Sequence, residues 1–213
     1  MARRYSSEVR AEQRHATRQR VVGAARELLL RRGYSGATIE AIAGRAGVSV
    51  QTVYNTVGGK AAVLKAVYDV MLAGDDEPIP IMQRPAVRAM QAATDPRRFL
   101  ALYARLGRQM YERAGPLLPI MLSEGAAGDP EVGAFLDTIE EERARGTAEI
   151  AALLQERFGL RDGLTVADAA DILWTLTAPD LPIRLIHRRG WSLDKFEAWW
   201  AETMARALVP PGR

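Results

Sequence analysis

Residues 38–60 read TIEAIAGRAGVSVQTVYNTVGGK. Thr38 and Ser49 can each accept a hydrogen bond from the first turn of a following helix, and Gly47 suits a tight turn between the two helices. Apolar side chains at helical spacing would face inward: Ile39, Ile42, Ala43, Ala46, Val53 and Val57. This spacing predicts a helix-turn-helix, whose short second helix can enter the major groove of DNA.

Two further helices are predicted around this segment. The first would begin after Thr17, which suits an N-cap, and would end before Gly33, which suits a C-cap. Another would run from Lys60, behind a glycine pair, to Gly74. Their apolar stripes consist of Val21, Val22, Ala25, Leu28 and Leu29 in one helix, and Val63, Leu64, Val67 and Met71 in the other. Residues 17–74 are therefore predicted to form a four-helix head.

The charge is divided unevenly along the chain. The 213 residues carry a net charge of +3, but residues 1–60 hold eleven Lys or Arg against four Asp or Glu, a net of +7. A polyanionic partner for this part follows, because neutralising phosphates releases counterions. A solvated, arginine-rich surface is the alternative interpretation.

Residues 1–16 contain no apolar periodicity, and they are predicted to form either a mobile basic arm or a fraying helical extension. Their arginines could enter the minor groove, lie along phosphates or contribute only nonspecific attraction. The arginines are Arg3, Arg4, Arg10 and Arg14.

Residues 75–213 are predicted to form a second, larger helical domain, which makes the fold all-α. Prolines at 78, 80, 85 and 96 mark a connection with one short helix near 86–93. Helices are then expected over 99–111, from Pro116 to Gly125, from Pro130 to about 158, over 166–189 with kinks at Pro179 and Pro182, and over 192–208. No β alternation occurs in this half.

Composition excludes several kinds of site. The chain has no cysteine and two histidines, which argues against a disulfide, a thiolate nucleophile or a metal centre. No glycine-rich phosphate loop follows a strand, and no apolar run reaches the ~20 residues that span a bilayer. We therefore expect a cytoplasmic protein without cofactor or metal, and an enzyme is a remote alternative.

The head resembles the TetR family of bacterial transcriptional regulators over roughly residues 17–72. The residues that carry the resemblance are Thr38, Ile42, Ala43, Ala46, Gly47, Val48, Ser49, Tyr54 and Lys60, after a helix with Ala25 and Gly33. Many members have an aromatic residue where this chain has Val57, and the glycine pair at 58–59 is a looser junction than usual. The resemblance implies a helical C-terminal domain that dimerises and often binds a small molecule.

The resemblance also implies different roles for different residues of the helix-turn-helix. Side chains expected to reach base edges are Gln51, Thr52 and Asn55, with Val50 as an apolar contact. Those expected to contact the DNA backbone are Thr38, Ser49, Tyr54 and Lys60. The alternatives are a core aromatic with one wet edge for Tyr54 and a merely solvated cation for Lys60.

A regulator of this kind implies an effector site and a dimer. Six side chains could line a site for a small apolar or amphipathic effector, although each could equally fill the core: Tyr103, Met110, Tyr111, Met121, Phe135 and Trp174. Asp171 and Asp180 are expected in caps or ion pairs, with the orientation of a polar group near Trp174 as the alternative. His187 is expected at a helix end or a dimer interface. The last two helical stretches, with Trp199 and Trp200, are predicted to form a homodimer on a palindromic operator. Repression released by a ligand is the preferred hypothesis, and a regulator without a small-molecule inducer is the alternative.

Overall fold

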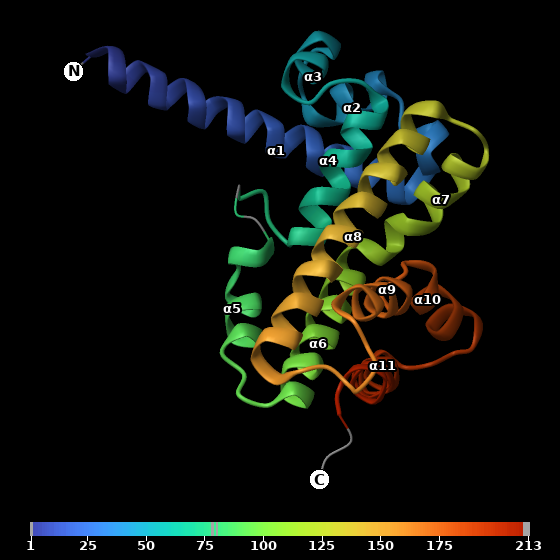
Figure 1. The fold of residues 1–213 in the computed structure, drawn as a ribbon. Coiled ribbons are helices and arrows are strands. Elements are labelled where there is room, and N and C mark those ends of the chain that lie inside the picture. Colours follow the sequence, from blue (N-terminus) through green and yellow to red (C-terminus); the bar gives the residue numbers. More distant parts are fainter. Residues whose placement is uncertain (1, 78, 80, 211–213) are drawn as a thin grey trace. The chain divides into compact units, whose positions relative to one another are not determined.

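The computed structural model describes residues 2–77, 79 and 81–210, and the side chains of residues 2–9 and of residue 82 lie outside that description. Helices dominate and no β-strand occurs in these ranges, which confirms the predicted all-α fold (Figure 1). The α-helices are α1 (Ala2–Gly36), α2 (Ile39–Ala46), α3 (Val50–Thr56), α4 (Lys60–Ala73), α5 (Pro85–Gln91), α6 (Pro96–Ala114), α7 (Leu118–Ala126), α8 (Pro130–Phe158), α9 (Val166–Leu176), α10 (Asp180–Pro182) and α11 (Leu193–Leu208). Two 3-10 helices, η1 (Ile81–Gln83) and η2 (Gly115–Leu117), and a π-helix, η3 (Ile183–Arg188), complete the described elements.

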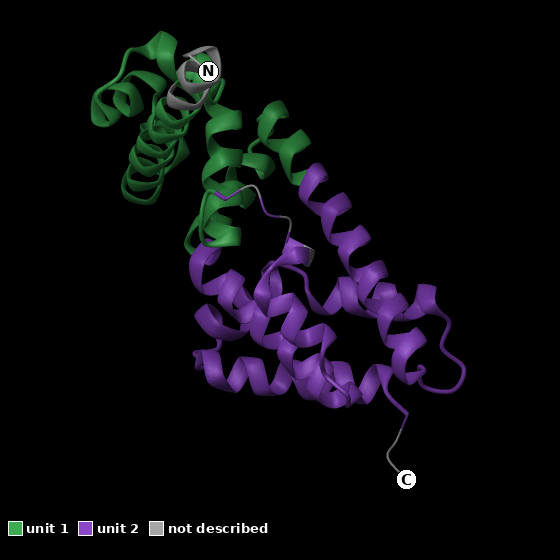
Figure 2. Cartoon of the chain, turned by 90° about the vertical axis from the view of Figure 1, so that its left-hand side faces the viewer, with its two compact units in different colours: residues 1–76, 116–136 green, residues 77–115, 137–213 purple. Residues whose placement is uncertain are grey.

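The chain forms two compact units, coloured separately in Figure 2. The first unit consists of residues 1–76 and 116–136, and the second of residues 77–115 and 137–213. The first unit thus joins the helix-turn-helix head to α7 and the start of α8. From the sequence alone, those later residues are expected in the C-terminal domain.

The helix-turn-helix forms because its caps are local. The Thr38 hydroxyl accepts a hydrogen bond from the Ala41 amide at 3.2 Å, and the Ser49 hydroxyl accepts one from the Thr52 amide at 3.1 Å. Between the two helices, Gly47 adopts a left-handed conformation with φ 66°. Each cap satisfies an amide that the helix itself cannot, so α2 and α3 begin where the sequence predicts.

The core of the first unit follows the predicted apolar stripes. Every stripe residue of α1, α2 and α4 is buried, as is Val53 of α3, while Val57 is half-buried. Tyr68 and Phe135 add an edge-to-face contact with ring centroids 5.7 Å apart. An ion pair also ties α2 to α1, because the Arg45 guanidinium donates to Glu27 at 2.7 and 2.9 Å and lowers the pKa of that carboxyl.

The first helix includes the stretch before Thr17, so the helical extension is the predicted alternative that is observed over the described residues 2–16. α1 starts at Ala2, so the prediction that Thr17 caps its N-terminus is wrong. Thr17 lies inside the helix, where its hydroxyl donates to the Gln13 carbonyl at 2.8 Å instead of capping an amide. The preceding stretch is rich in Arg, Glu, Gln and Ala, which favour helix. Gly33, with φ 68°, interrupts the helical geometry near the predicted end.

Gly47→Ala is expected to lower the free energy of unfolding of the first unit by about 1–2 kcal/mol, because an L-residue is disfavoured in the left-handed region. A methyl group at this position would meet no atom within 4 Å, so the cost is conformational. Gly44→Ala, also with open space but inside α2, is the control and should stabilise by up to about 1 kcal/mol. Urea unfolding measures both, and equal effects would contradict the assignment.

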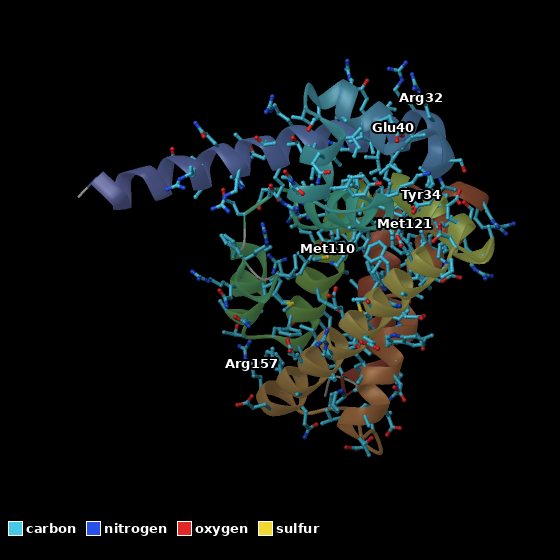
Figure 3. The ribbon with its side chains drawn as sticks, turned by 90° about the horizontal axis from the view of Figure 1, so that it is seen from above. Arg32, Tyr34, Glu40, Met110, Met121 and Arg157 are labelled. Atoms are coloured by element: carbon cyan, nitrogen blue, oxygen red, sulfur yellow. The ribbon has the colours of Figure 1, made fainter. Side chains whose placement is uncertain are left out.

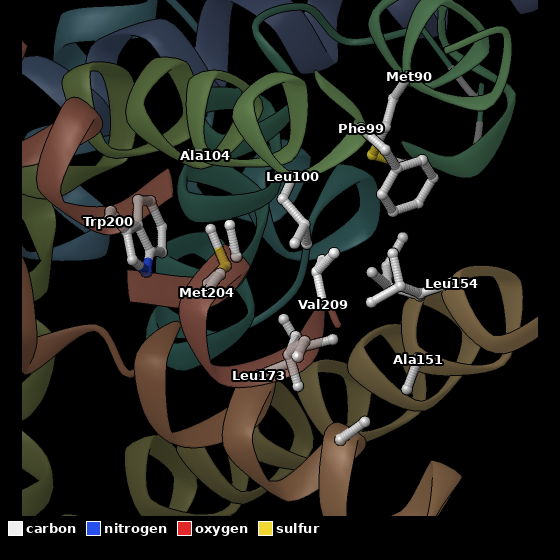
Figure 4. Close-up of a cluster of buried hydrophobic side chains, with 14 of the residues drawn as sticks. Met90, Phe99, Leu100, Ala104, Ala151, Leu154, Leu173, Trp200, Met204 and Val209 are labelled. Carbon is white, nitrogen blue, oxygen red and sulfur yellow. The ribbon is translucent and has the colours of Figure 1, made fainter. Parts of the chain in front are cut away.

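In the second unit, α6 and α11 lie side by side and share one core with α5, α9 and the later part of α8. Fully buried members of this cluster include Phe99, Leu100, Ala104, Leu154, Leu173 and Met204 (Figure 4). The Trp200 ring lies against Gly107 of α6, so closely that a Cβ at that glycine would stand 2.5 Å from it. A glycine in α6 therefore makes room for the tryptophan.

The aromatic side chains of α11 mostly belong to this core. The sequence predicts Trp199 and Trp200 in a partner surface, and for Trp200 this is wrong. Trp200 is 6% exposed and Phe196 1%, with their ring centroids 5.1 Å apart. The remaining helices of the unit cover them. Trp199 is half-buried, with its ring 5.6 Å from that of Trp191.

The prolines fall where the helical path changes. α5 confirms the predicted short helix, whereas Pro78 and Pro80 lie outside the described residues. Pro179 lies in the break between α9 and α10, as predicted, whereas Pro182 is the last residue of α10 and the chain continues directly into η3. In the described part of the chain, no helix is long and apolar enough to cross a membrane.

Candidate nucleic-acid interface

The outer face of α3 carries the side chains predicted to read bases. Gln51 and Asn55 are exposed on successive turns, and the Gln51 amide nitrogen donates to the Asn55 side-chain oxygen at 2.9 Å. Tyr54 is 50% exposed and Val50 36%. Tyr54 is thus exposed and does not belong to the buried core.

The Gln51–Asn55 bond orients both amides. Each side chain uses one group in this bond, which leaves the Gln51 carbonyl and the Asn55 amino group directed elsewhere. One acceptor and one donor are the complement of the adenine N6 and N7 edge in the major groove. The outer face of α3 therefore presents one free acceptor and one free donor from this pair.

Thr38, Ser49 and Thr52 lie at the starts of the two helices. Thr38 and Ser49 accept capping hydrogen bonds, and the Ser49 and Thr52 hydroxyls are 2.8 Å apart. Capping leaves other first-turn amides available, and such amides suit a phosphate. Because Thr52 is half-buried and bonded to Ser49, its reach toward a base is shorter than that of Gln51.

Lys60, the first residue of α4, is held by the end of α1. Its ammonium lies 4.2 Å from the Tyr34 ring centroid and 3.5 Å from the Ser35 carbonyl oxygen. Tyr34 itself is buried, and its pKa is raised to about 12 by burial and by the carboxylates of Asp129, Glu131 and Glu124. The sequence does not reveal the role of Tyr34, because it is far from Lys60 in the chain and belongs to no motif. It positions the cation.

Residues 21–67 match the family described as bacterial regulatory proteins, tetR family. No curated protein matches the chain. The N-terminal domain is that of a tetR-family regulator. The protein is therefore a DNA-binding transcriptional regulator.

Solved structures share the fold over nearly the whole chain. NalD, the secondary repressor of the MexAB-OprM multidrug efflux pump in Pseudomonas aeruginosa, is 22% identical with a TM-score of 0.67, over 93% of this chain and 98% of that one. A Saccharomonospora viridis protein solved with choline is 21% identical with a TM-score of 0.65, over 90% and 97%. PfmR from Thermus thermophilus is 21% identical with a TM-score of 0.55, over 91% and 96%.

In this tetR-family domain, Lys60→Ala is expected to weaken binding to all DNA alike and to lower the slope of log K against log salt by about one unit. Loss of the cation above Tyr34 should also cost about 0.5–1 kcal/mol of folding stability. Lys65→Ala is the control, since Lys65 is paired with Asp69 at 2.8 Å on the same helix. Salt titrations with operator and random duplexes measure the slopes, and an unchanged slope would leave Lys60 a purely structural role.

The six predicted effector-lining residues are divided between the units. Met121 (Figure 3) and Phe135 are buried in the first unit. Tyr103, Met110 and Tyr111 are half-buried on α6 in the second. Trp174, also in the second unit, is 41% exposed, with the Arg143 guanidinium 5.3 Å from its ring centroid.

The second unit also holds buried polar atoms without a hydrogen-bond partner among the described residues. They are the Tyr111 hydroxyl, Arg143 Nε and Trp200 Nε1. Burial raises the pKa of Tyr103 to about 12 and also raises that of Tyr111, so both phenols stay neutral at physiological pH. The sequence does not single out Arg143 or the Trp200 nitrogen, since burial in the folded unit is what makes them notable. Unpaired buried donors are costly and uncommon.

The remaining polar candidates have ordinary surroundings. Asp180 pairs with Arg184 at 2.9 Å, as expected for a helix-surface ion pair. Asp171 is exposed. His187 lies in the last turn of η3, with its ring 6.3 Å from that of Tyr111. The ion pair of Asp180 and the position of His187 at a helix end agree with the roles expected from the sequence.

Proposed function

We propose that the protein is a homodimeric cytoplasmic repressor that binds a palindromic operator and leaves it when a small molecule binds its second unit. The observation that carries the sequence-reading part is the exposed, mutually hydrogen-bonded Gln51–Asn55 pair on α3. The net charge of +7 over residues 1–60 supports attraction to the DNA backbone. NalD, which has the same fold, is named as a repressor.

A two-fold dimer would place two reading helices about 34–36 Å apart, or somewhat more, on a palindrome. The exposed side of α9 is the surface that we assign to the partner. Val166 is 37% exposed and Trp174 41%, and with Ala170 they form a stripe at four-residue spacing. Half-buried Trp199 of α11 adds apolar area. Trp200 is left out because its ring is used inside the subunit.

The effector is proposed to be apolar or amphipathic and to carry hydrogen-bond acceptors. Tyr111, Arg143 and Trp200 each hold a buried donor without a partner among the described residues, and an acceptor on a ligand would remove that cost. Such a ligand would favour the DNA-incompetent state by its differential affinity.

Selection of genomic DNA with the purified protein, followed by footprinting, tests the repressor hypothesis. We expect a palindromic site, protected by two subunits, near a promoter. Trp174→Glu should weaken both dimerisation, measured by sedimentation, and operator affinity. If the wild-type protein selected only random fragments at concentrations where it is dimeric, the proposal would be contradicted.

Ligand responsiveness has a separate test. A panel of amphipathic compounds, including choline, is screened for a rise in the melting temperature, and hits are added to the operator complex. A compound that saturates the protein and releases the operator supports induction. Saturation with unchanged operator affinity would instead favour a regulator of the same fold without a small-molecule inducer.

A further inference from the structure

The N-terminal part of α1 continues a helix face that is buried further along. Val21 is 0% exposed in the core of the first unit. Positions 17, 14 and 10 lie four, seven and eleven residues earlier, so they fall on the same side of the helix. These positions hold Thr17, Arg14 and Arg10 in place of apolar residues. The face that packs on protein at Val21 is thus cationic where it extends beyond the core.

This cationic face forms one wall of an open groove. The groove has a volume of about 580 Å³ and is lined by Arg10, Gln13, Arg14 and Thr17 from α1 and by Thr52 and Thr56 from α3. The second wall therefore belongs to the helix that carries Gln51 and Asn55. Every lining side chain is polar, and two carry positive charge.

The α1 extension is fixed at its base. Arg18 Nε donates to Asp76 Oδ1 at 3.4 Å, and the Asp76 side chain is only 13% exposed. Asp76 lies just beyond the end of α4, so this contact connects the extension to the segment that follows α4 in the same unit. The base of the groove is consequently built into the fold.

We propose that this groove, which we call the α1–α3 channel, holds the sugar-phosphate backbone beside the bases that α3 reads. The proposal rests on the DNA-binding function of the head. Guanidinium groups bind phosphate oxygens through fixed pairs of donors, while hydroxyl and amide groups add neutral hydrogen bonds. Arg10 and Arg14 thereby become phosphate contacts. A mobile arm over residues 1–16 does not suit this channel, because a helical wall is needed. Arg3 and Arg4 have side chains outside the described part of the structure and are not included.

The test is the double substitution Arg10→Gln and Arg14→Gln, which removes two charges while keeping good helix formers. Each phosphate contact releases about 0.9 counterion, so it strengthens binding about fivefold at 0.15 M salt relative to 1 M salt. Two lost contacts multiply this factor. We expect about 30-fold weaker binding to operator and random duplexes, and a salt slope smaller by about two units. Hydroxyl-radical footprints should lose protection at the sugars flanking the bases read by α3.

Arg26→Gln, an exposed arginine further along α1, is the control for a lost charge. It should change the salt slope by much less than the double substitution in the channel. An unchanged slope and footprint in the double variant, with circular dichroism and melting temperature like the wild type, would overturn the channel while leaving the repressor hypothesis standing. A wild-type protein that selects no operator would overturn the repressor hypothesis itself, whereas a salt-dependent loss on random DNA would still support the channel.

Discussion

Trp200→Ala is expected to lower the free energy of unfolding by about 3–5 kcal/mol. The Trp200 ring is 6% exposed, lies against Gly107 of α6 and has its centroid 5.1 Å from that of Phe196. Removing it would leave a cavity in the contact between α6 and α11, which the surrounding helices can only partly close. Urea unfolding followed by far-ultraviolet circular dichroism measures the loss.

Trp199→Ala is the matched control, because Trp199 is the adjacent residue and is only half-buried. A smaller loss of stability is expected for it. Unfolding measured at several protein concentrations distinguishes a core role from an interface role, because dimer contacts contribute to stability only where the dimer is populated. The effect of Trp200→Ala should persist at dilutions where the wild type is monomeric. If it vanished there, Trp200 would belong to the interface after all.

Gln51→Ala is expected to cost about 1–3 kcal/mol of binding free energy on the operator and to relax discrimination at one base position. Binding to random DNA should change little, because Gln51 carries no charge. Competition binding against a set of single-base operator variants measures both quantities.

Asn55 supplies a second check on this surface. Because Gln51 donates to Asn55 at 2.9 Å, the two side chains act together, and the double alanine variant should lose less than the sum of the two single losses. Gln91→Ala, an exposed glutamine of the second unit, is the control and should leave operator binding unchanged. Equal losses on operator and random DNA for Gln51→Ala would contradict base reading.

Local signals account for the accuracy of the helix-turn-helix prediction. Thr38, Gly47 and Ser49 determine helix ends through atoms a few residues away, so a short stretch of sequence contains the needed information. The same holds for Ser192, whose hydroxyl accepts from the Lys195 amide at 3.1 Å and starts α11 as predicted. Thr17 shows the limit of such signals, because a capable cap residue inside a helix-favouring stretch simply continues the helix.

The effector side is harder to predict, because apolar spacing on one helix does not reveal what covers it. Met121 and Phe135 occupy apolar positions of predicted helices, as Tyr103 and Tyr111 do. In the structure, however, the first two lie in one unit and the other two in the second. The unpaired Trp200 nitrogen and Arg143 Nε become visible only once burial is known. Such properties depend on residues distant in the chain.

The sequence by itself determined that the chain is helical, that residues 38–60 form a helix-turn-helix, and that Gln51 and Asn55 face outward, since caps, turns and periodicity act over a few residues. Only the tertiary structure decided that Tyr34 positions Lys60, that Gly107 admits Trp200, and that Arg10 and Arg14 stand opposite Thr52 and Thr56. These contacts join segments far apart in the chain. Whether such segments meet depends on how whole helices pack, which no local pattern records.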